Sequence, residues 1–142
     1  MKDQRGVDST TIMEAMENKH KVMIVDDNPI DQLITAYILK LDHQKGDILV
    51  MTSANEALDY LAQHSNTPTA LPSLIYLDLD MPVMNGFDFL QRFKEYADVV
   101  KEGCRIVVVT ASEALSDIEK MKSDPHVVKL ISKPLHRHSL AL

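Results

Sequence analysis

The stretch KVMIVDDNPIDQLITAYILKL, residues 21–41, contains the pattern that decides the fold. Val22 to Val25 is a short apolar run, which is typical of a strand buried on both faces of a parallel sheet. Asn28 follows as a candidate N-cap, and Pro29 takes the first helical position, where its missing N–H costs nothing. From Ile30 to Leu41 apolar residues recur at helical spacing. The stretch therefore predicts a strand that turns directly into a helix.

The same alternation continues along the rest of the chain. Further strands are predicted at 48–52, 74–77, 106–109 and 127–131. Helices are predicted after the capping-box pair Ser53 and Glu56, after Gly86, and from Ala114 onward. Strands that alternate with helices form βαβ units with right-handed crossovers, so the fold class is α/β with a doubly wound parallel sheet. Ligands of such sheets bind at the carboxyl ends of the strands.

Composition places the chain among globular proteins with one domain. It has 142 residues, of which 45% are hydrophobic and 25% charged. Residues 1–20 read as an amino-terminal extension, either a short helix or disordered, and residues 21–142 as the domain. The apolar runs are too short to cross a membrane and no secretory signal is apparent, so we expect no membrane partner. The single cysteine, Cys104, suits a cytoplasmic location. The net charge of −6 argues against a nucleic-acid partner.

Polar side chains follow four of the predicted strands. They are Asp26 and Asp27, then Asp78 and Asp80, then Thr110, and finally Lys133. Clustered carboxylates repel one another and favour a bound cation, and a few oxygen ligands with room for water suit Mg²⁺. A carboxylate beside a divalent cation and a lysine is an arrangement that forms an aspartyl phosphate. The sequence therefore predicts a phosphoryl-transfer site at this edge of the sheet.

Four motifs occur in order along the chain: Val25-Asp26-Asp27, the stretch LDLDMPVMNG at 77–86, Val109-Thr110-Ala111 and Ser132-Lys133-Pro134. Together they resemble the receiver domain of bacterial response regulators, from about residue 21 to residue 135. The resemblance implies a flavodoxin-like fold with five parallel strands in the order 2-1-3-4-5. It also implies a stand-alone, chemotaxis-regulator-like switch of a two-component phosphorelay.

The resemblance also assigns metal ligands. Asp26 and Asp27 would form the acidic pocket. Mg²⁺ would be bound directly by Asp27, by Asp78 and by the backbone carbonyl of Asp80, and through water by Asp26.

Further roles follow from the same resemblance. Asp78 would be the phosphoacceptor, with Thr110 and Lys133 as the other two catalytic residues. Thr110 would also act as a switch together with Leu130, at a position where the family usually has Tyr or Phe. The peptide bond between Lys133 and Pro134 is expected to be cis. The phosphoryl group would come from a sensor histidine kinase or a histidine phosphotransfer protein, and the chain would catalyse only its own phosphotransfer and autodephosphorylation.

Besides Leu130, three further features depart from the family's usual pattern: the carboxylate of Asp80, the short segment after Pro134 and the lack of room for an output domain. Asp80 places a carboxylate two residues after the acceptor, where the family varies, and its effect on phosphoryl lifetime does not follow from the sequence. Eight residues follow Pro134, which predicts a shortened last helix and leaves no room for an output domain. We therefore expect a homodimer or a downstream protein to bind the face built by the fourth helix, the fifth strand and the fifth helix.

Two alternatives remain at this stage. A haloacid-dehalogenase-like phosphatase also uses an aspartate nucleophile with a second aspartate two residues later, as Asp78 and Asp80 are spaced. That motif normally ends the first strand, and it would leave Asp26 and Asp27 unexplained. The other alternative is a pseudo-receiver, an interaction module that keeps the fold without phosphorylation.

Overall fold

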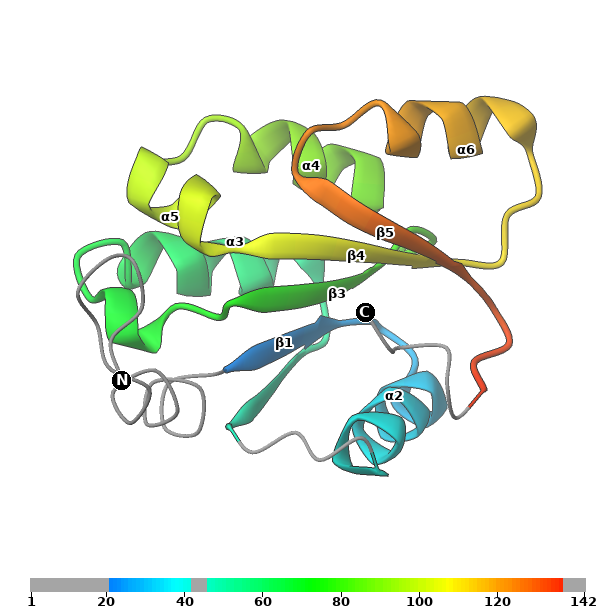
Figure 1. Cartoon of the computed structure of the whole chain (residues 1–142), viewed down its shortest axis with the longest axis horizontal. Coiled ribbons are helices and arrows are strands. Elements are labelled where there is room, and N and C mark those ends of the chain that lie inside the picture. The colour runs from blue at the N-terminus through cyan, green and yellow to red at the C-terminus, as the bar shows by residue number, and fades with distance from the viewer. Residues whose placement is uncertain (1–20, 42–45, 137–142) are drawn as a thin grey trace, which may run out of the picture.

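The computed structural model describes residues 21–41 and 46–136 of the chain. Five parallel strands form one sheet in the order β2-β1-β3-β4-β5 (Figure 1). The strands are β1 (Val22–Val25), β2 (Ile48–Met51), β3 (Leu74–Asp78), β4 (Arg105–Thr110) and β5 (Val127–Ser132). The helices are α2 (Pro29–Leu41), α3 (Ala54–Gln63), α4 (Gly86–Phe93), α5 (Asp98–Gly103) and α6 (Leu115–Lys122), with a 3₁₀ turn at Pro68–Ala70. The predicted α/β class and strand order are confirmed.

Helices cover both faces of the sheet, which explains why its strands are continuous apolar runs. Along β1, Met23 faces the large core under α3, α4, α5 and α6, whereas Ile24 faces a smaller core under α2. The same alternation holds in β3, where Ile75 and Tyr76 lie in different cores. Figure 1 shows α2 on the side of the sheet opposite to the other helices. Because successive strand residues point to opposite faces, both sets must be apolar.

The large core is built around aromatic side chains of α4. Phe89 and Phe93 are fully buried, and their ring centroids lie 6.0 Å apart. Phe93 also meets the ring of His126 edge-on at 5.2 Å. This packing fixes α4 against the sheet, and α4 in turn fixes the loop that leaves β3.

The loop between β3 and α4 is held by close backbone contacts. A Cβ atom on Gly86 would lie 2.9 Å from the Cα atom of Leu79 and 3.0 Å from the carbonyl oxygen of Asp78, so this position requires glycine. Asn85 and Asp88 close a capping box at the start of α4. Val83 has a φ of 67° and sits at the centre of a γ-turn, in which the Met84 N–H donates to the Pro82 carbonyl at 2.7 Å.

Several local predictions differ from the structure. The strands predicted at 74–77, 106–109 and 127–131 are one or two residues longer, at Leu74–Asp78, Arg105–Thr110 and Val127–Ser132. The short helix α5 was not predicted, because it has six residues, no side-chain cap and one buried residue, Val100. The predicted strand at 48–52 ends one residue earlier, since the N–H and hydroxyl of Thr52 both bond to the Glu56 carboxylate. The Ser53 side chain accepts from the Glu56 N–H at 3.1 Å, as predicted. The Glu56 carboxylate accepts from Thr52 and not from the Ser53 N–H, so the predicted capping box is only half formed.

Some predictions concern residues outside the described part of the chain. The amino-terminal extension, residues 1–20, lies there entirely, and the predicted shortened last helix lies there apart from Leu135 and His136, which belong to no helix. Within the described residues, no helix has the length and apolarity needed to cross a lipid bilayer.

Candidate functional site

Three aspartates from two neighbouring strands meet at the carboxyl edge of the sheet. Asp26 and Asp27 directly follow β1, and Asp78 is the last residue of β3, which pairs with β1. One carboxylate oxygen of each lies within 4.8 Å of the others. Asp26 and Asp78 are buried, whereas Asp27 is exposed. The structure therefore brings together three of the four carboxylates that the strand ends predicted, and the exposed Asp80 side chain is not part of this cluster.

The turn between β1 and α2 holds Asp26 in place. One Asp26 carboxylate oxygen accepts from the backbone N–H of Asn28 at 2.9 Å. The backbone carbonyl of Asp26 accepts from the side-chain amide of Gln32 at 2.6 Å. The Asn28 side chain in turn accepts from the N–H groups of Ile30 and Asp31. Asn28 is thus the predicted N-cap of α2, and the helix begins in a fixed position beside the acidic cluster.

Asp78 is a buried carboxylate with an unusually high proton affinity. Burial and the neighbouring Asp26 carboxylate raise its pKa to about 6, although the Lys133 ammonium group opposes the rise. The backbone N–H of Asp80 donates to its Oδ1 at 3.3 Å. Burial also raises the pKa of Asp26. Two buried carboxylates this close destabilise each other when both are ionised, and a bound cation would relieve that repulsion.

Lys133 places one ammonium group among three carboxylates. Its Nζ atom lies 2.9 Å from Asp31, 3.4 Å from Asp78 and 3.6 Å from Asp26. Burial alone would lower the pKa of Lys133, but the hydrogen bond to Asp31 and the nearby carboxylates outweigh it, and the pKa is raised. The Lys133 backbone N–H donates to the Thr110 carbonyl, and the bond to Pro134 is cis, as predicted.

Thr110 is the last residue of β4 and is buried. Its hydroxyl oxygen accepts from the Ser112 N–H at 2.9 Å, and the Ser112 hydroxyl donates to the Asp117 carboxylate on α6 at 2.8 Å. The Thr110 side chain is therefore tied to the loop that leads into α6. Leu130, the predicted partner of Thr110 in switching, is half-buried on β5 against the large core.

Two groups at this site were missed by reasoning from the sequence. Asp31 makes the shortest contact with Lys133, yet an acidic residue in the first turn of a helix is common and gave no signal of its own. Ser112 was missed because its role depends on the path of the loop after β4. Asp80 is exposed, and the proposal that its carbonyl is a ligand stays a prediction.

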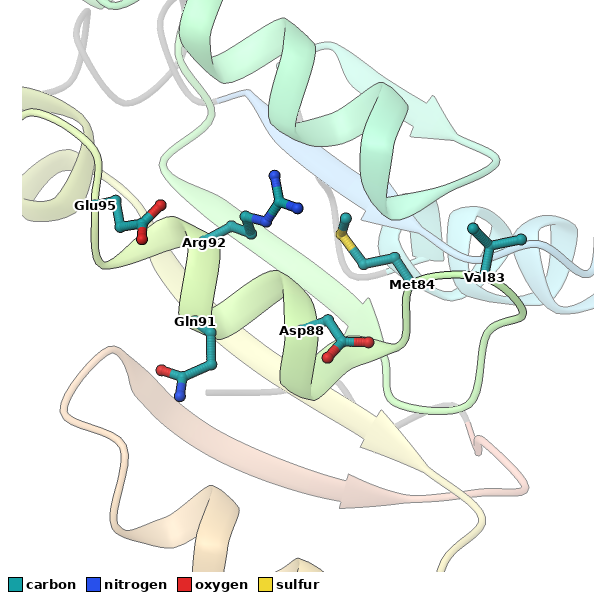
Figure 2. A pocket seen from close by; sticks show the side chains of 6 residues that line it. All are labelled: Val83, Met84, Asp88, Gln91, Arg92 and Glu95. Atoms are coloured by element: carbon teal, nitrogen blue, oxygen red, sulfur yellow. The ribbon is translucent and has the colours of Figure 1, made fainter.

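Two cavities of about 320 Å³ lie near this end of the molecule. The first is beside Lys133 and is lined by Asp31, Ile34, Ala111, Lys133, Pro134 and Leu135. The second, shown in Figure 2, is formed by the loop after β3 and the outer side of α4, and is lined by Val83, Met84, Asp88, Gln91, Arg92 and Glu95. The second cavity contains none of the predicted site residues.

This fold and site define a class of α/β protein that carries an acidic pocket and a lysine at the carboxyl edge of a doubly wound sheet. The sequence model of the response regulator receiver domain matches residues 22–142, so the chain belongs to that family.

Relatives of known class agree with this assignment. The probable methanogenesis regulatory protein FilR2 of Methanothrix harundinacea is 28% identical over 130 residues, which cover 92% of this chain and 81% of that protein. The two-component response regulator ARR17 of Arabidopsis thaliana is 34% identical over 116 residues, covering 76% of this chain and 71% of that protein. The crystal structure of a two-component response regulator from Cytophaga hutchinsonii superposes with a TM-score of 0.78 at 26% identity, covering 87% of this chain and 92% of that one.

The chain is therefore a receiver domain homologous to two-component response regulators, and its function is that of a phosphorylation-dependent signalling switch. The two alternatives are not favoured. Asp78 ends the third strand along the chain, not the first as in the phosphatase motif. A pseudo-receiver does not need an acidic pocket or a lysine beside it, yet here the three aspartates and Lys133 lie close together.

Proposed function

We propose that Asp78 is the residue that accepts the phosphoryl group. The observation that carries this proposal is the position of its carboxylate: it is buried at the end of the central strand, with two further carboxylates within 4.8 Å and the Lys133 ammonium at 3.4 Å. A pKa of about 6 leaves Asp78 largely ionised at neutral pH, as a nucleophile must be.

The donor set fits a hard divalent cation. Asp26, Asp27 and Asp78 offer carboxylate oxygens, which are the ligands that Mg²⁺ prefers. We propose that Asp27, Asp78 and the Asp80 carbonyl bind Mg²⁺ directly and that Asp26 binds it through water. When bound, the ion offsets the negative charge of the carboxylates and of the phosphoryl oxygens.

The phosphoryl group comes from a phosphohistidine of a sensor kinase or a histidine phosphotransfer protein. A carboxylate oxygen of Asp78 attacks the phosphorus in line, so that an O–P bond forms while the P–N bond to the imidazole breaks. Lys133 binds an oxygen of the transferred group, and the Thr110 hydroxyl donates to another. Later hydrolysis of the acyl phosphate returns the domain to its first state, without turnover of any other substrate.

Labelling with a small donor tests the phosphoacceptor. With acetyl phosphate and Mg²⁺, intact-mass spectrometry should show one added phosphoryl group, and Asp78→Asn should show none. Asp47→Asn is a matched control, because Asp47 also contacts a lysine but lies at the other end of the sheet. A label that persists in Asp78→Asn would rule out this assignment.

Metal binding is tested by calorimetric titration with Mg²⁺. Asp27→Ala and Asp78→Asn should each weaken binding by at least about tenfold, because each removes a direct ligand. Removal of one carboxylate also relieves repulsion, so the metal-free fold should be kept. An unchanged affinity in Asp27→Ala would mean that the ion binds elsewhere.

We propose that the output face is formed by α6 and β5, and that a second copy of the chain binds there. Two apolar side chains on this face are exposed, Leu115 on α6 and Val128 on β5. The tie from Thr110 through Ser112 to Asp117 links this face to the acceptor site. Light scattering at tens of micromolar protein should detect a dimer whose population changes on phosphorylation. A strict monomer in both states would exclude self-association.

A further inference from the structure

Lys133 makes its closest contact with a residue that the proposed phosphotransfer does not use. The hydrogen bond of its ammonium group goes to Asp31 at 2.9 Å, whereas the contacts with Asp78 and Asp26 are longer, at 3.4 and 3.6 Å. A distance of 2.9 Å is typical of a charge-assisted hydrogen bond, and the two longer ones are not. Lys133 is thus drawn toward Asp31, and its ion pairs with Asp78 and Asp26 are the longer ones.

We infer that Asp31 is a positioning residue for Lys133, which it draws away from Asp78 so that the acidic pocket stays open to a divalent cation and to the phosphoryl group. This inference rests on the proposed function of Asp78. It assigns Asp31 no contact with the reacting atoms, and its effect passes through the lysine.

The position of Asp31 is fixed independently of Lys133. Its N–H donates to the side chain of Asn28, the N-cap of α2, at 3.1 Å. Its carboxylate lies in the first turn of the helix, where the helix dipole favours negative charge. Its side chain is 34% exposed, against 7% for Asp26 and 5% for Asp78. The Asp31 carboxylate therefore loses less hydration than the two buried carboxylates, and its backbone is held by the N-cap, so it can anchor the ammonium group.

Loss of Asp31 would redirect the ammonium group inward. Its nearest remaining partners are the carboxylates of Asp78 and Asp26. An ammonium group in direct contact with Asp78 competes with a cation for the same oxygen atoms and repels it. Divalent-cation affinity should then fall, although none of the proposed ligands has changed.

Lys133 also has room to move between its partners. The cavity of about 320 Å³ beside it is lined in part by Asp31 and Lys133 themselves. The side chain is 20% exposed and lies at the border of this cavity. When a phosphoryl group is bound to Asp78, the Lys133 ammonium group can therefore move from Asp31 to a phosphoryl oxygen without any change in the packed core.

A double-mutant cycle followed by Mg²⁺ titration tests the inference. Asp31→Asn should weaken Mg²⁺ binding about fivefold in the wild-type background and less than about twofold in Lys133→Met. Asp47→Asn is the control, because it removes a carboxylate from another lysine contact, at the amino end of the sheet. It should leave the affinity unchanged. An equal effect of Asp31→Asn in both backgrounds, or none in either, would overturn the inference.

The rate of labelling by acetyl phosphate gives a second readout. At low Mg²⁺ concentration Asp31→Asn should be labelled several-fold more slowly than the wild type, and saturating Mg²⁺ should restore the rate. A rate that stays low at saturation would contradict the proposed route through cation binding. If the wild type is not labelled at all, the proposed function fails, while the titration cycle still decides whether Asp31 acts through Lys133.

Discussion

The two ends of the sheet each carry a lysine–aspartate contact of nearly the same length. At the amino end, Lys21 lies 3.0 Å from Asp47, whose side chain is 73% exposed. At the carboxyl end, Lys133 lies 2.9 Å from Asp31, and two buried carboxylates are within reach of the same ammonium group. The residue types are the same and the distances nearly equal, but among the residues that the structure describes only the carboxyl end places several carboxylates around one ammonium group.

Burial and convergence, not contact distance, distinguish the lysine–aspartate contact at the proposed site from the one at the amino end. Water screens the pair at the amino end, where such contacts contribute little to stability. At the carboxyl end, burial and the repulsion from Asp26 raise the pKa of Asp78 to about 6, and the Lys133 ammonium group offsets only part of this rise. Under the proposed function, the protein keeps this unfavourable arrangement because the divalent cation that would relieve it is needed for phosphotransfer.

Neutralising Asp78 should give the largest effect on stability. In the absence of Mg²⁺, Asp78→Asn should raise the free energy of unfolding by about 3 kcal/mol at about pH 7. The pKa of this carboxyl is 3.8 in its reference state and about 6 in the fold. Between those values the unfolded chain releases the proton first, so the wild type loses stability as pH rises through this range.

Unfolding at low pH is the control for this prediction. Below about pH 4 the carboxyl is protonated in both states, so the gap between variant and wild type should close. Urea denaturation at about pH 7 and below about pH 4 measures the difference in the free energy of unfolding between the variant and the wild type. A gap of equal size at both pH values would mean that packing, not charge, separates the two proteins.

Adding a side-chain atom to the tightly packed loop after β3 should give the next largest effect on stability. Gly86→Ala should lower the free energy of unfolding by about 2 kcal/mol, because the new Cβ would press on the backbone of Leu79 and Asp78. Gly103→Ala is the matched control, since a Cβ at the end of α5 meets nothing within 4 Å. It should be neutral or stabilise by up to about 1 kcal/mol. Equal effects of the two variants would show that the loop does not depend on this close approach.

Relieving the backbone strain at the centre of the γ-turn should give a smaller gain in stability. Val83→Asn should raise the free energy of unfolding by about 1 kcal/mol, because a β-branched residue is strained at a φ of 67° and Asn tolerates it better. Val83 is 97% exposed, so no packing is lost. Val128→Asn, at an exposed strand position, should bring no gain. Thermal or urea unfolding decides, and a loss of stability in Val83→Asn would contradict the assigned strain.

The smallest effect is expected at the amino end of the sheet. Asp47→Asn should change the free energy of unfolding by no more than about 0.5 kcal/mol, since its contact with Lys21 is exposed to water. The difference should vanish in about 1 M salt, where the Debye length is about 3 Å. A larger or salt-independent change would remove the contrast between the two ends.

The sequence alone determined the fold and most of the site. The alternation of apolar runs with helical stripes specified a doubly wound sheet, because both patterns report on neighbours that are close in the chain. The carboxyl ends of parallel strands share one edge, so Asp26, Asp27 and Asp78 could be placed together before any coordinates were known. The N-cap Asn28 followed from local chemistry in the same way.

Only the tertiary structure decided which partners meet across long stretches of chain. Asp31 and Lys133 are 102 positions apart, and their hydrogen bond depends on how α2 packs against the sheet. The helix α5 likewise forms although no side chain caps it, because its residue Val100 packs into the large core. Periodicity and capping rules describe contacts within a few residues, whereas these contacts are set by the packing of distant elements.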